Sequence, residues 1–407
     1  MTRLYLDNAA TSFPKPPCVP EAMTHYLTQV GGTAGRGNYL EARRGAEIIR
    51  DCRERLCRLF RAADPDHIVF TLNTSDALNL AIRGTIEHRR LTHPGKPIHV
   101  IATSLDHNSV LRPLNAERDL GLEWTCVDAD PRTGTIDLAA IARAIRPTTV
   151  LVALNHASNV TGTIQPAAAV GEICRTRGVL FLLDAAQSLG HIPVYADDLA
   201  VDLLAFPGHK GLLGPLGTGG LYIRPGIEHL IRPTRTGGTG SRSELDIQPH
   251  TMPDRYEPGS QNAVGIAGLS AALAWILERE RDLHAHDRLL RAAMLDRLAA
   301  LDAFGPREGA QGLRLLGPTD PDARVGVFSL VFDGLSPHEA AALLEERHGI
   351  LARAGLHCAP RAHAALGTTS AGGALRLSIG PFITLADLDH VGTALTELAS
   401  ITRAATA

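Results

Sequence analysis

The sequence predicts an α/β protein, in which a doubly wound, mostly parallel sheet is followed by a smaller α+β region. Two observations predict this fold class. Short apolar runs rich in valine, isoleucine and leucine alternate with amphipathic stretches through most of the chain, a pattern typical of parallel sheets covered by helices. Beyond about residue 265 the pattern changes to one long helical stretch, followed by strand, helix and strand.

The expected elements follow in chain order. Buried strands are expected at residues 67–71, 98–102, 149–155, 179–184 and 203–206. Helices are expected at residues 77–90, 138–145 and 167–177. The second region is expected to contain a helix over 264–300, a strand over 325–332 and two helices that start at the capping sequences 336–339 and 384–387. The glycine-rich stretch 236–243 is the best candidate for a flexible loop.

The length of the chain, 407 residues, predicts more than one domain. Single hydrophobic cores rarely grow beyond about 250 to 300 residues. We therefore expect an N-terminal arm (1–15) associated with a small C-terminal domain (266–407), and a large domain (16–265) between them.

Composition excludes several function classes. The net charge is -3 and charges are scattered without blocks, which argues against a nucleic-acid or membrane-surface partner. No apolar stretch approaches the roughly 18 to 20 residues of a membrane span, and the first residues lack a secretion signal. Six isolated cysteines indicate a reducing compartment, so we expect a cytoplasmic protein. No CxxC or His-rich pair occurs, and no structural metal is expected.

Lysine is scarce, because only Lys15, Lys96 and Lys210 occur among 40 basic residues. The first two lie in proline-flanked stretches and are expected to be exposed. Lys210 instead follows the strand 203–206. A desolvated lysine can lose its proton and form a Schiff base with a carbonyl, which an arginine cannot do. Lys210 is therefore a candidate catalytic residue, although an ordinary loop lysine is the alternative.

Asp184 ends the expected strand 179–184, one strand before Lys210 in the sequence. Because ligands gather at the carboxyl ends of parallel strands, both side chains can reach the same crevice. An acid that pairs with a pyridinium nitrogen and an amine that holds an aldehyde are the two groups that pyridoxal phosphate most needs. Capping of a helix or loop is the alternative role of Asp184.

A phosphate site is expected where residues 73–76 follow a strand and open a helix. Thr74 and Ser75 there offer hydroxyls and free backbone N–H groups at the positive end of the helix. Plain N-capping is the alternative reading. His209 can donate to the same phosphate, and His107, which follows the strand 98–102, can stack on a cofactor ring. The chain has 18 histidines, so a surface or core role is the alternative for His107.

Four spaced motifs together resemble the cysteine desulfurase and selenocysteine lyase family, within the class V aminotransferase group of fold-type I pyridoxal phosphate enzymes. They are Tyr5-Leu6-Asp7-Asn8-Ala9-Ala10-Thr11, Asn155-His156-Ala157-Ser158-Asn159-Val160-Thr161-Gly162, Asp184-Ala185-Ala186-Gln187 and Gly208-His209-Lys210. The resemblance covers nearly the whole chain, and it implies the family's cofactor, pyridoxal 5'-phosphate.

The resemblance also implies a role for each matching residue. Lys210 would form the Schiff base, Asp184 would pair with the ring nitrogen, and Gln187 would donate to the ring hydroxyl. The remaining implied roles are ring stacking by His107, phosphate binding by Thr74, Ser75 and His209, cofactor and substrate contacts by Asn159, substrate binding by Asn8 and a bidentate grip on the substrate carboxylate by Arg376. Taken alone, Arg376 reads as a surface strand arginine. Ser260, in Glu257 to Asn262, would reach the phosphate of a neighbouring subunit, which implies a homodimer.

Cys358 is the residue that discriminates among reactions. A free cysteine is usually a buried structural thiol. Here Gly355 and Pro360 bracket a short loop without apolar periodicity, and His357 can help to sustain a thiolate. In the family, the cysteine of this motif takes sulfur from bound cysteine as a persulfide. The short spacing resembles the SUF-like branch, whose sulfur passes to an acceptor protein.

Two departures from the family pattern stand out. Pro207 precedes Gly208-His209-Lys210 where many relatives carry a small hydroxyl residue, and proline can donate neither from its side chain nor from its backbone. Phe382 and Ile383 replace an expected tyrosine and asparagine. One phosphate contact and the detail of substrate recognition therefore differ from the pattern.

The leading hypothesis is a pyridoxal phosphate-dependent L-cysteine desulfurase that leaves alanine and a persulfide on Cys358. A selenocysteine lyase, a C–S lyase or an amino-acid epimerase on the same scaffold is the nearest alternative. A cofactor-free binding or scaffolding protein of the same fold is an alternative from another class; it predicts a colourless protein without a borohydride-fixable adduct on Lys210.

Overall fold

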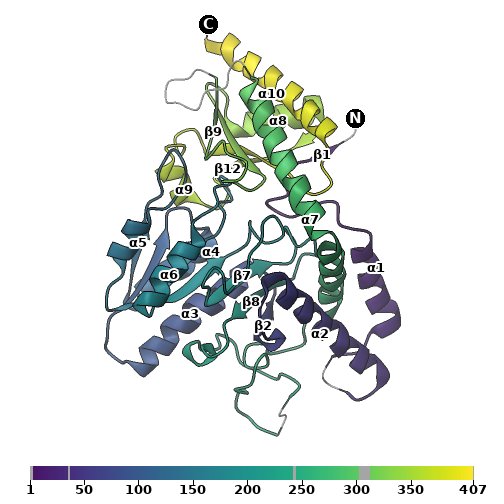
Figure 1. Ribbon diagram of the computed structural model, residues 1–407, viewed down its shortest axis with the longest axis vertical. Helices are drawn as coiled ribbons and strands as arrows, with labels where there is room; N and C mark the ends of the chain where they lie inside the picture. Colours follow the sequence, from purple (N-terminus) through teal and green to yellow (C-terminus); the bar gives the residue numbers. More distant parts are fainter. Residues whose placement is uncertain (1–2, 35–36, 242–243, 302–311, 407) are drawn as a thin grey trace.

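The computed structural model describes residues 3–34, 37–241, 244–301 and 312–406. Among these, no helix combines the length and the apolar character that crossing a membrane requires. The chain forms a large sheet domain and, above it in Figure 1, a smaller domain that carries the C-terminal helix.

The large sheet has seven strands in the order β2-β8-β7-β6-β5-β3-β4. Their bounds are Ile68–Thr71 (β2), Ile98–Thr103 (β3), Leu122–Val127 (β4), Thr149–Asn155 (β5), Leu180–Asp184 (β6), Leu203–Pro207 (β7) and Gly219–Ile223 (β8). Strands β4, β3, β5, β6 and β7 pair in parallel, whereas β8 is antiparallel to both of its neighbours. The fold is therefore the predicted mixed α/β type with a mostly parallel sheet.

Helices cover both faces of this sheet, as a doubly wound fold requires. Alternate strand residues enter two separate cores, so that Leu183 belongs to one core and its neighbour Leu182 to the other. The core around Leu183 includes residues of α2 (Leu40–Phe60) and α6 (Ala167–Arg177). The core around Leu182 includes residues of α3 (Thr74–Thr92) and α4 (Asn108–Arg118). Helix α5 (Leu138–Ala144) adds to the first core through Ile141.

The smaller domain has a four-stranded antiparallel sheet in the order β12-β13-β10-β9. Its strands are Leu313–Leu315 (β9), Val327–Phe332 (β10), Arg353–Gly355 (β12) and Ala374–Ser378 (β13). Helices α8 (Pro337–His348) and α10 (Leu385–Thr406) contribute to its core, and α9 (Pro360–Ala365) follows the Cys358 loop. The predicted capping box is present in α8, where Ser336 accepts from the Glu339 N–H at 3.2 Å.

The chain start belongs to the smaller domain by its pairing. Strand β1 (Leu4–Tyr5) pairs in parallel with β11 (Ile350–Leu351), and Leu6 lies in the core of that domain. Helix α1 (Cys18–His25), which continues as a π-helix over Tyr26–Val30, returns to the large domain, where Val19 is buried in the first core.

Helix α7 (Ala263–Ala299) is shared between the two domains, as Figure 1 shows. Residues from Ile266 to Ile276 lie in the large-domain core, whereas those from Leu290 to Leu298 lie in the core of the smaller domain. We propose that the division falls inside α7, beyond Ile276, and not at the expected boundary between residues 265 and 266. The sequence pattern located the start of the helix. The helix passes from the core of the large domain to that of the smaller domain at a later point.

The five predicted strands of the large sheet and the helices between them are present within three residues of their expected bounds. The predictions omitted α1, α4, β4 and β8, and the strands β9 and β12 of the smaller sheet, whereas the expected strand around Arg376 is β13. Part of the glycine-rich stretch 236–243 lies outside the described residues; the described residues from Ile231 to Asn262 form no helix or strand.

Candidate active site

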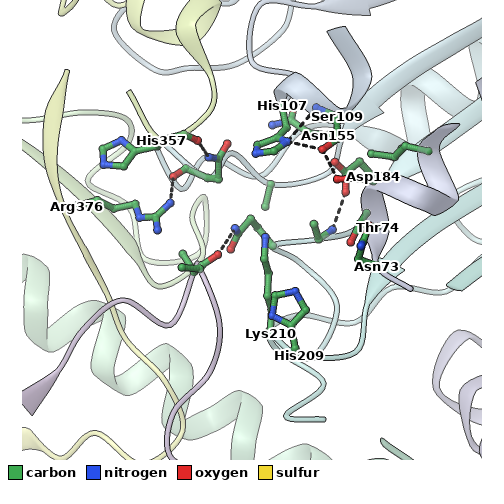
Figure 2. Close-up of a pocket in the computed structure, with 18 of the residues that line it drawn as sticks. Asn73, Thr74, His107, Ser109, Asn155, Asp184, His209, Lys210, His357 and Arg376 are labelled. Atoms are coloured by element: carbon green, nitrogen blue, oxygen red, sulfur yellow. Dashed lines mark hydrogen bonds between the residues drawn. The ribbon is translucent and has the colours of Figure 1, made fainter. Parts of the chain in front are cut away.

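The carboxyl ends of five strands converge on one cavity of about 240 Å³. Thr74 follows β2, His107 follows β3, Asn155 ends β5, Asp184 ends β6 and Lys210 follows β7. Figure 2 shows Lys210 between Thr74 on one side and Arg376, which comes from the smaller domain, on the other. The site therefore forms where the edge of the large sheet meets the smaller domain.

Lys210 and Asp184 influence each other's charge within this cavity. Burial lowers the pKa of the Lys210 ammonium to about 8, although the Asp184 carboxylate opposes this shift. Burial raises the pKa of the Asp184 carboxyl, and the Ala186 N–H, which donates to Oδ1 at 3.0 Å, opposes that shift together with Lys210. A lysine with such a lowered pKa holds a substantial fraction of neutral, nucleophilic amine near neutral pH.

Two helix N-termini point toward the same side of the cavity. Helix α3 begins at Thr74, with Asn73 as its N-cap, and α4 begins after His107. Ser75 Oγ and Ser109 Oγ lie 2.6 Å apart and join the two helix starts. Free backbone N–H groups and hydroxyls at paired helix N-termini favour an anion such as a phosphate.

His107 and His209 are both neutral imidazoles in this environment. Burial lowers the pKa of each to about 4, and the Lys210 ammonium adds to the effect. His107 Nδ1 accepts from the Ser109 N–H at 3.1 Å, which places the ring proton on Nε2. His209 Nδ1 is buried without a hydrogen-bond partner among the described residues. Because His209 lines the cavity, this unpaired buried nitrogen is available to a ligand there.

Arg376 is almost fully buried, with 1% of its surface exposed, and its guanidinium lines the cavity. It donates to Asp7 Oδ1 at 2.6 Å and to the Asn159 carbonyl at 3.2 Å, while Nε has no described partner. Burial lowers the pKa of Arg376, and Asp7 opposes that shift. A buried guanidinium with spare donors is suited to bind a carboxylate in a bidentate manner.

Cys358 lies at the rim, as an exposed residue of the loop between β12 and α9. It lines a second hollow, of about 490 Å³, which shares Ser75, His107 and Ser109 with the main cavity. Both His357 and Cys358 adopt left-handed backbone angles, with φ of 50° and 57°. Non-glycine residues seldom adopt this conformation, and it recurs at functional sites.

Hydrogen bonds from the large domain hold this strained loop. Asn159 Nδ2 donates to the His357 carbonyl at 2.7 Å, and the Asn108 N–H donates to the Cys358 carbonyl at 2.9 Å. The cation beside the sulfur is Arg353, whose guanidinium lies 3.5 Å from Cys358 Sγ.

The expectation that His357 helps to sustain a thiolate is wrong. Its ring is buried and lies 3.2 Å from His363 Nε2, and burial lowers its pKa to about 2. A neutral, buried imidazole offers no charge to the sulfur, and Arg353 occupies the place that the sequence reading gave to His357.

Of three further expected site residues, one lines the cavity and two do not. Gln187 lines the cavity, with its Nε2 donating to the Ala9 carbonyl at 2.9 Å. Asn8 does not line this cavity; its side-chain amide donates to the Tyr5 and Ser378 carbonyls and accepts from the Phe13 N–H. Ser260 is exposed and lines separate hollows that share no residue with the main cavity.

Sequence reasoning missed Lys15, which was expected to be exposed. Lys15 is half-buried, and its Nζ donates to Ser12 Oγ at 2.7 Å and to the His209 carbonyl at 3.0 Å. The scarcity of lysine, with only three in the chain, was the sequence signal that could have singled out Lys15. Lys96 is exposed, as expected.

The residues that depart from the family pattern have the following surroundings. Pro207 ends β7, opposite Gly219. Phe382 lies against Trp275, with ring centroids 5.9 Å apart, and the Ile383 carbonyl lies 2.9 Å from His286 Nε2. Among the described residues, no group of three or more His, Cys, Asp or Glu side chains has the arrangement of a metal site.

Comparison with known proteins identifies the family of this chain. The family model described as "Aminotransferase class-V" matches residues 4–391. The chain belongs to the class V aminotransferase family. The cofactor of this class V aminotransferase is pyridoxal phosphate.

Relatives of this class V aminotransferase include a "Probable cysteine desulfurase" of Methanothermobacter thermautotrophicus, 32% identical over 98% of the chain and 95% of the relative. A protein of the same name from Pyrococcus abyssi is 33% identical over 88% of the chain and 85% of the relative. The solved cysteine desulfurase of Thermococcus onnurineus is 30% identical, with a TM-score of 0.86 over 98% of this chain and 95% of that one. An Escherichia coli cysteine desulfurase superposes with a TM-score of 0.83 at 27% identity, over 98% and 95% of the two chains.

The cavity fits pyridoxal phosphate on its own chemistry. Lys210 offers an amine for the aldehyde, and Asp184 a carboxylate for the ring nitrogen. The helix starts at Thr74 and Ser75 offer N–H groups and hydroxyls for the phosphate, and the unpaired His209 Nδ1 lies in the same buried surroundings. His107, a flat neutral ring on the cavity wall, is available for stacking.

Proposed function

We propose that this enzyme is a pyridoxal phosphate-dependent L-cysteine desulfurase, which converts L-cysteine into alanine and an enzyme persulfide on Cys358. The observation that carries the proposal is the position of an exposed thiol at the rim of the cavity that holds Lys210 and Arg376. Relatives that match nearly the whole chain bear the name cysteine desulfurase, which supports the same activity.

The site residues divide the work between binding and proton transfer. Arg376 binds the substrate carboxylate, because it is a buried cation with spare donors. Lys210 holds the cofactor, then moves the substrate α-proton as its pKa of about 8 permits. When bound, the cofactor supplies an electron sink that weakens bonds at the substrate α-carbon. Asp184 would pair with the ring nitrogen of the bound cofactor and keep it protonated, and His107 would lie against the face of the ring.

Cys358 receives the sulfur. Its thiolate attacks the sulfur of bound cysteine, a new S–S bond forms, and the bond between substrate Cβ and sulfur breaks. The electron pair of the broken bond stays on Cβ, which takes a proton and ends as the methyl group of alanine. Arg353, 3.5 Å from the sulfur, favours the anionic thiolate before the attack and the anionic persulfide after it.

Mass spectrometry after incubation with L-cysteine tests this assignment. We expect one added sulfur on Cys358, alanine in the same amount, and neither product in the Cys358→Ala variant, which should keep the visible absorbance of the cofactor. Cys126→Ser is the matched control, because Cys126 is half-buried and lines neither hollow. Full desulfurase turnover by Cys358→Ala would reject the role of the thiol.

The same assay separates the alternatives. A C–S lyase would release pyruvate, an epimerase would racemise the amino acid, and a selenocysteine lyase would release selenide in preference to transferring sulfur. The exposed Cys358 favours the desulfurase over these, because none of the other products requires a thiol at the rim.

Three finer assignments accompany the proposal. The short Gly355 to Pro360 loop supports the SUF-like branch, in which the persulfide passes to an acceptor protein. Ser260 is exposed and does not line the cavity of its own chain, so it is free for the contact that the homodimer requires, in which it reaches the partner's phosphate site. The six cysteines are all free thiols, which supports a cytoplasmic location.

A further inference from the structure

Four donors converge on one carbonyl oxygen beside the reactive lysine. The His209 carbonyl accepts from the Ser12 N–H at 2.9 Å, Thr11 Oγ1 at 3.1 Å, Ser12 Oγ at 3.2 Å and Lys15 Nζ at 3.0 Å. A carbonyl oxygen has two lone pairs, so four donors exceed the number that its hydrogen-bonding capacity requires. The peptide that it belongs to joins His209 to Lys210.

Lys15 is an unusual residue for such a place. It is half-buried, burial lowers its pKa to about 8, and it forms no ion pair with any described carboxylate. Burying part of an ammonium without a counter-ion opposes folding. Because a neutral hydroxyl or amide satisfies a carbonyl at less cost, hydrogen bonding alone does not account for a lysine here.

The segment that carries these donors also contacts other groups of the site. Asp7 pairs with Arg376 at 2.6 Å, and the Ala9 carbonyl accepts from Gln187 at 2.9 Å. One segment, residues 7–15, therefore contacts the carboxylate-binding arginine, a side chain of the cavity wall and the backbone of the reactive lysine. Its position bears on both ends of the cavity.

We propose that Lys15, with Thr11 and Ser12, forms a positioning site that fixes the His209–Lys210 peptide and so directs the Lys210 amine toward Asp184 and the cofactor. The inference rests on the proposed function through the role of Lys210. Lys210 projects into the cavity, while its backbone lies in the connection between β7 and β8. The hydrogen bonds to the His209 carbonyl restrain rotation of the His209–Lys210 peptide.

The variant Lys15→Met, which keeps the length of the side chain and loses the ammonium, tests the proposal in the holoenzyme. We expect kcat for alanine formation to fall about tenfold while KM changes less than about twofold, since a small misplacement of a reacting group costs rate more than binding. The visible circular dichroism of the bound cofactor, without substrate, should change as well, because it reports the fixed orientation of the ring. Lys15→Arg, which retains a cationic donor, should restore part of both signals.

Lys96→Met is the matched control, because Lys96 is exposed and remote from the site; it should leave both measurements unchanged. The paired change Thr11→Val and Ser12→Ala removes two of the other donors and should alter the same measurements in the same direction. This second variant keeps the test decisive if Lys15→Met does not fold.

An unchanged kcat and an unchanged visible circular dichroism spectrum in Lys15→Met would overturn the proposal. So would a fall in melting temperature alone, since that outcome describes a structural residue only. The proposed function has its own readout, borohydride fixation of the cofactor on Lys210 in the wild type. Absence of that adduct would reject the proposed function, independently of how Lys15→Met behaves.

Discussion

At the scale of single residues, the site depends on charges that are only partly screened by water. Lys210 loses basicity through burial, and Asp184 gains proton affinity through burial. The interaction between the two groups opposes both shifts, because each ionised partner favours the charged form of the other. A cationic ring bound beside Asp184 would therefore favour its carboxylate form.

The lowered pKa of Lys210 predicts how apoprotein takes up pyridoxal phosphate. The neutral amine reacts with the aldehyde, and it predominates above its folded pKa of about 8, well below the ordinary value of 10.5. We expect the rate of visible-band formation to rise with pH to a plateau, with a midpoint near 8. In Asp184→Asn the midpoint should shift downward, because the carboxylate raises the pKa of Lys210. A wild-type midpoint near 10 would contradict the desolvated site.

Sequence reasoning located several of these residues through position along the strands. Asp184 and Lys210 could be placed because each follows an apolar run, and strand ends share one sheet edge. Lys15 could not, since its contact depends on tertiary structure: the chain start crosses to the His209 carbonyl. Arg353 lies only five residues before Cys358, but its approach to the sulfur depends on the turn of the loop, which the sequence pattern does not show. His357 was misread because its burial is not visible in a short polar loop.

At the scale of elements, two adjacent strands of the smaller domain carry the substrate end of the site. Strand β12 leads into the Cys358 loop and β13 carries Arg376, and they pair with Arg353 opposite Arg376. Gly355 and Gly373 allow the strands to meet closely at the end nearest the loop: a Cβ on Gly373 would lie 2.1 Å from the Gly355 carbonyl oxygen.

Gly373→Ala is therefore expected to separate β12 from β13 and to move Cys358. Gly372→Ala is the matched control, since both glycines have positive φ, of 77° and 103°, but a Cβ on Gly372 would meet no atom within 4 Å. We expect Gly373→Ala to lower the free energy of unfolding by about 1 to 3 kcal/mol more than the control, the typical cost of overpacking. Desulfurase turnover should fall with it. Equal denaturation midpoints for the two variants would show that the close approach is not needed.

The strands that sequence reasoning missed share a physical cause. Strand β8 begins with Gly219 and Gly220, which pattern reading treats as a turn, although a Cβ at Gly220 would collide with the Phe206 ring 2.5 Å away. Strand β4 contains Glu123 on its exposed side, which interrupts the apolar run expected of a buried strand. Both strands depend on neighbours that are distant in sequence.

At the scale of the whole molecule, Ser260 does not line the Lys210 cavity of its own chain. That residue and its neighbours line a hollow of about 480 Å³ together with the buried ion pair of Arg53 and Glu257. No residue is common to this hollow and the Lys210 cavity. We expect a second subunit to bring Ser260 to a phosphate at Thr74.

Sedimentation should accordingly give twice the chain mass of 43.3 kDa. Ser260→Ala should weaken cofactor retention about tenfold, the effect of one lost hydrogen bond to a charged group. Dialysis of the holoenzyme, followed by the visible absorbance, measures this. Thr251→Val, an exposed change outside both hollows, serves as the control. A monomer that retains full cofactor occupancy would contradict the assigned contact.

Length predicts that the molecule divides into domains, but the expected boundary between residues 265 and 266 differs from the point where α7 changes its packing partner. That point lies between Ile276 and Leu290. The stretch 278–288 between them is rich in charged residues, a composition shift that the sequence prediction did not use.

The continuity of α7 limits how the enzyme can open. A helix of 37 residues, roughly 55 Å long at the usual rise per residue, is anchored at each end in a different core. Rigid-body rotation of one domain against the other would bend α7, so a domain opening that admits the amino acid would cost considerable free energy. We instead expect the substrate to enter through the hollow that Cys358 lines, and the sulfur to leave later by the same opening.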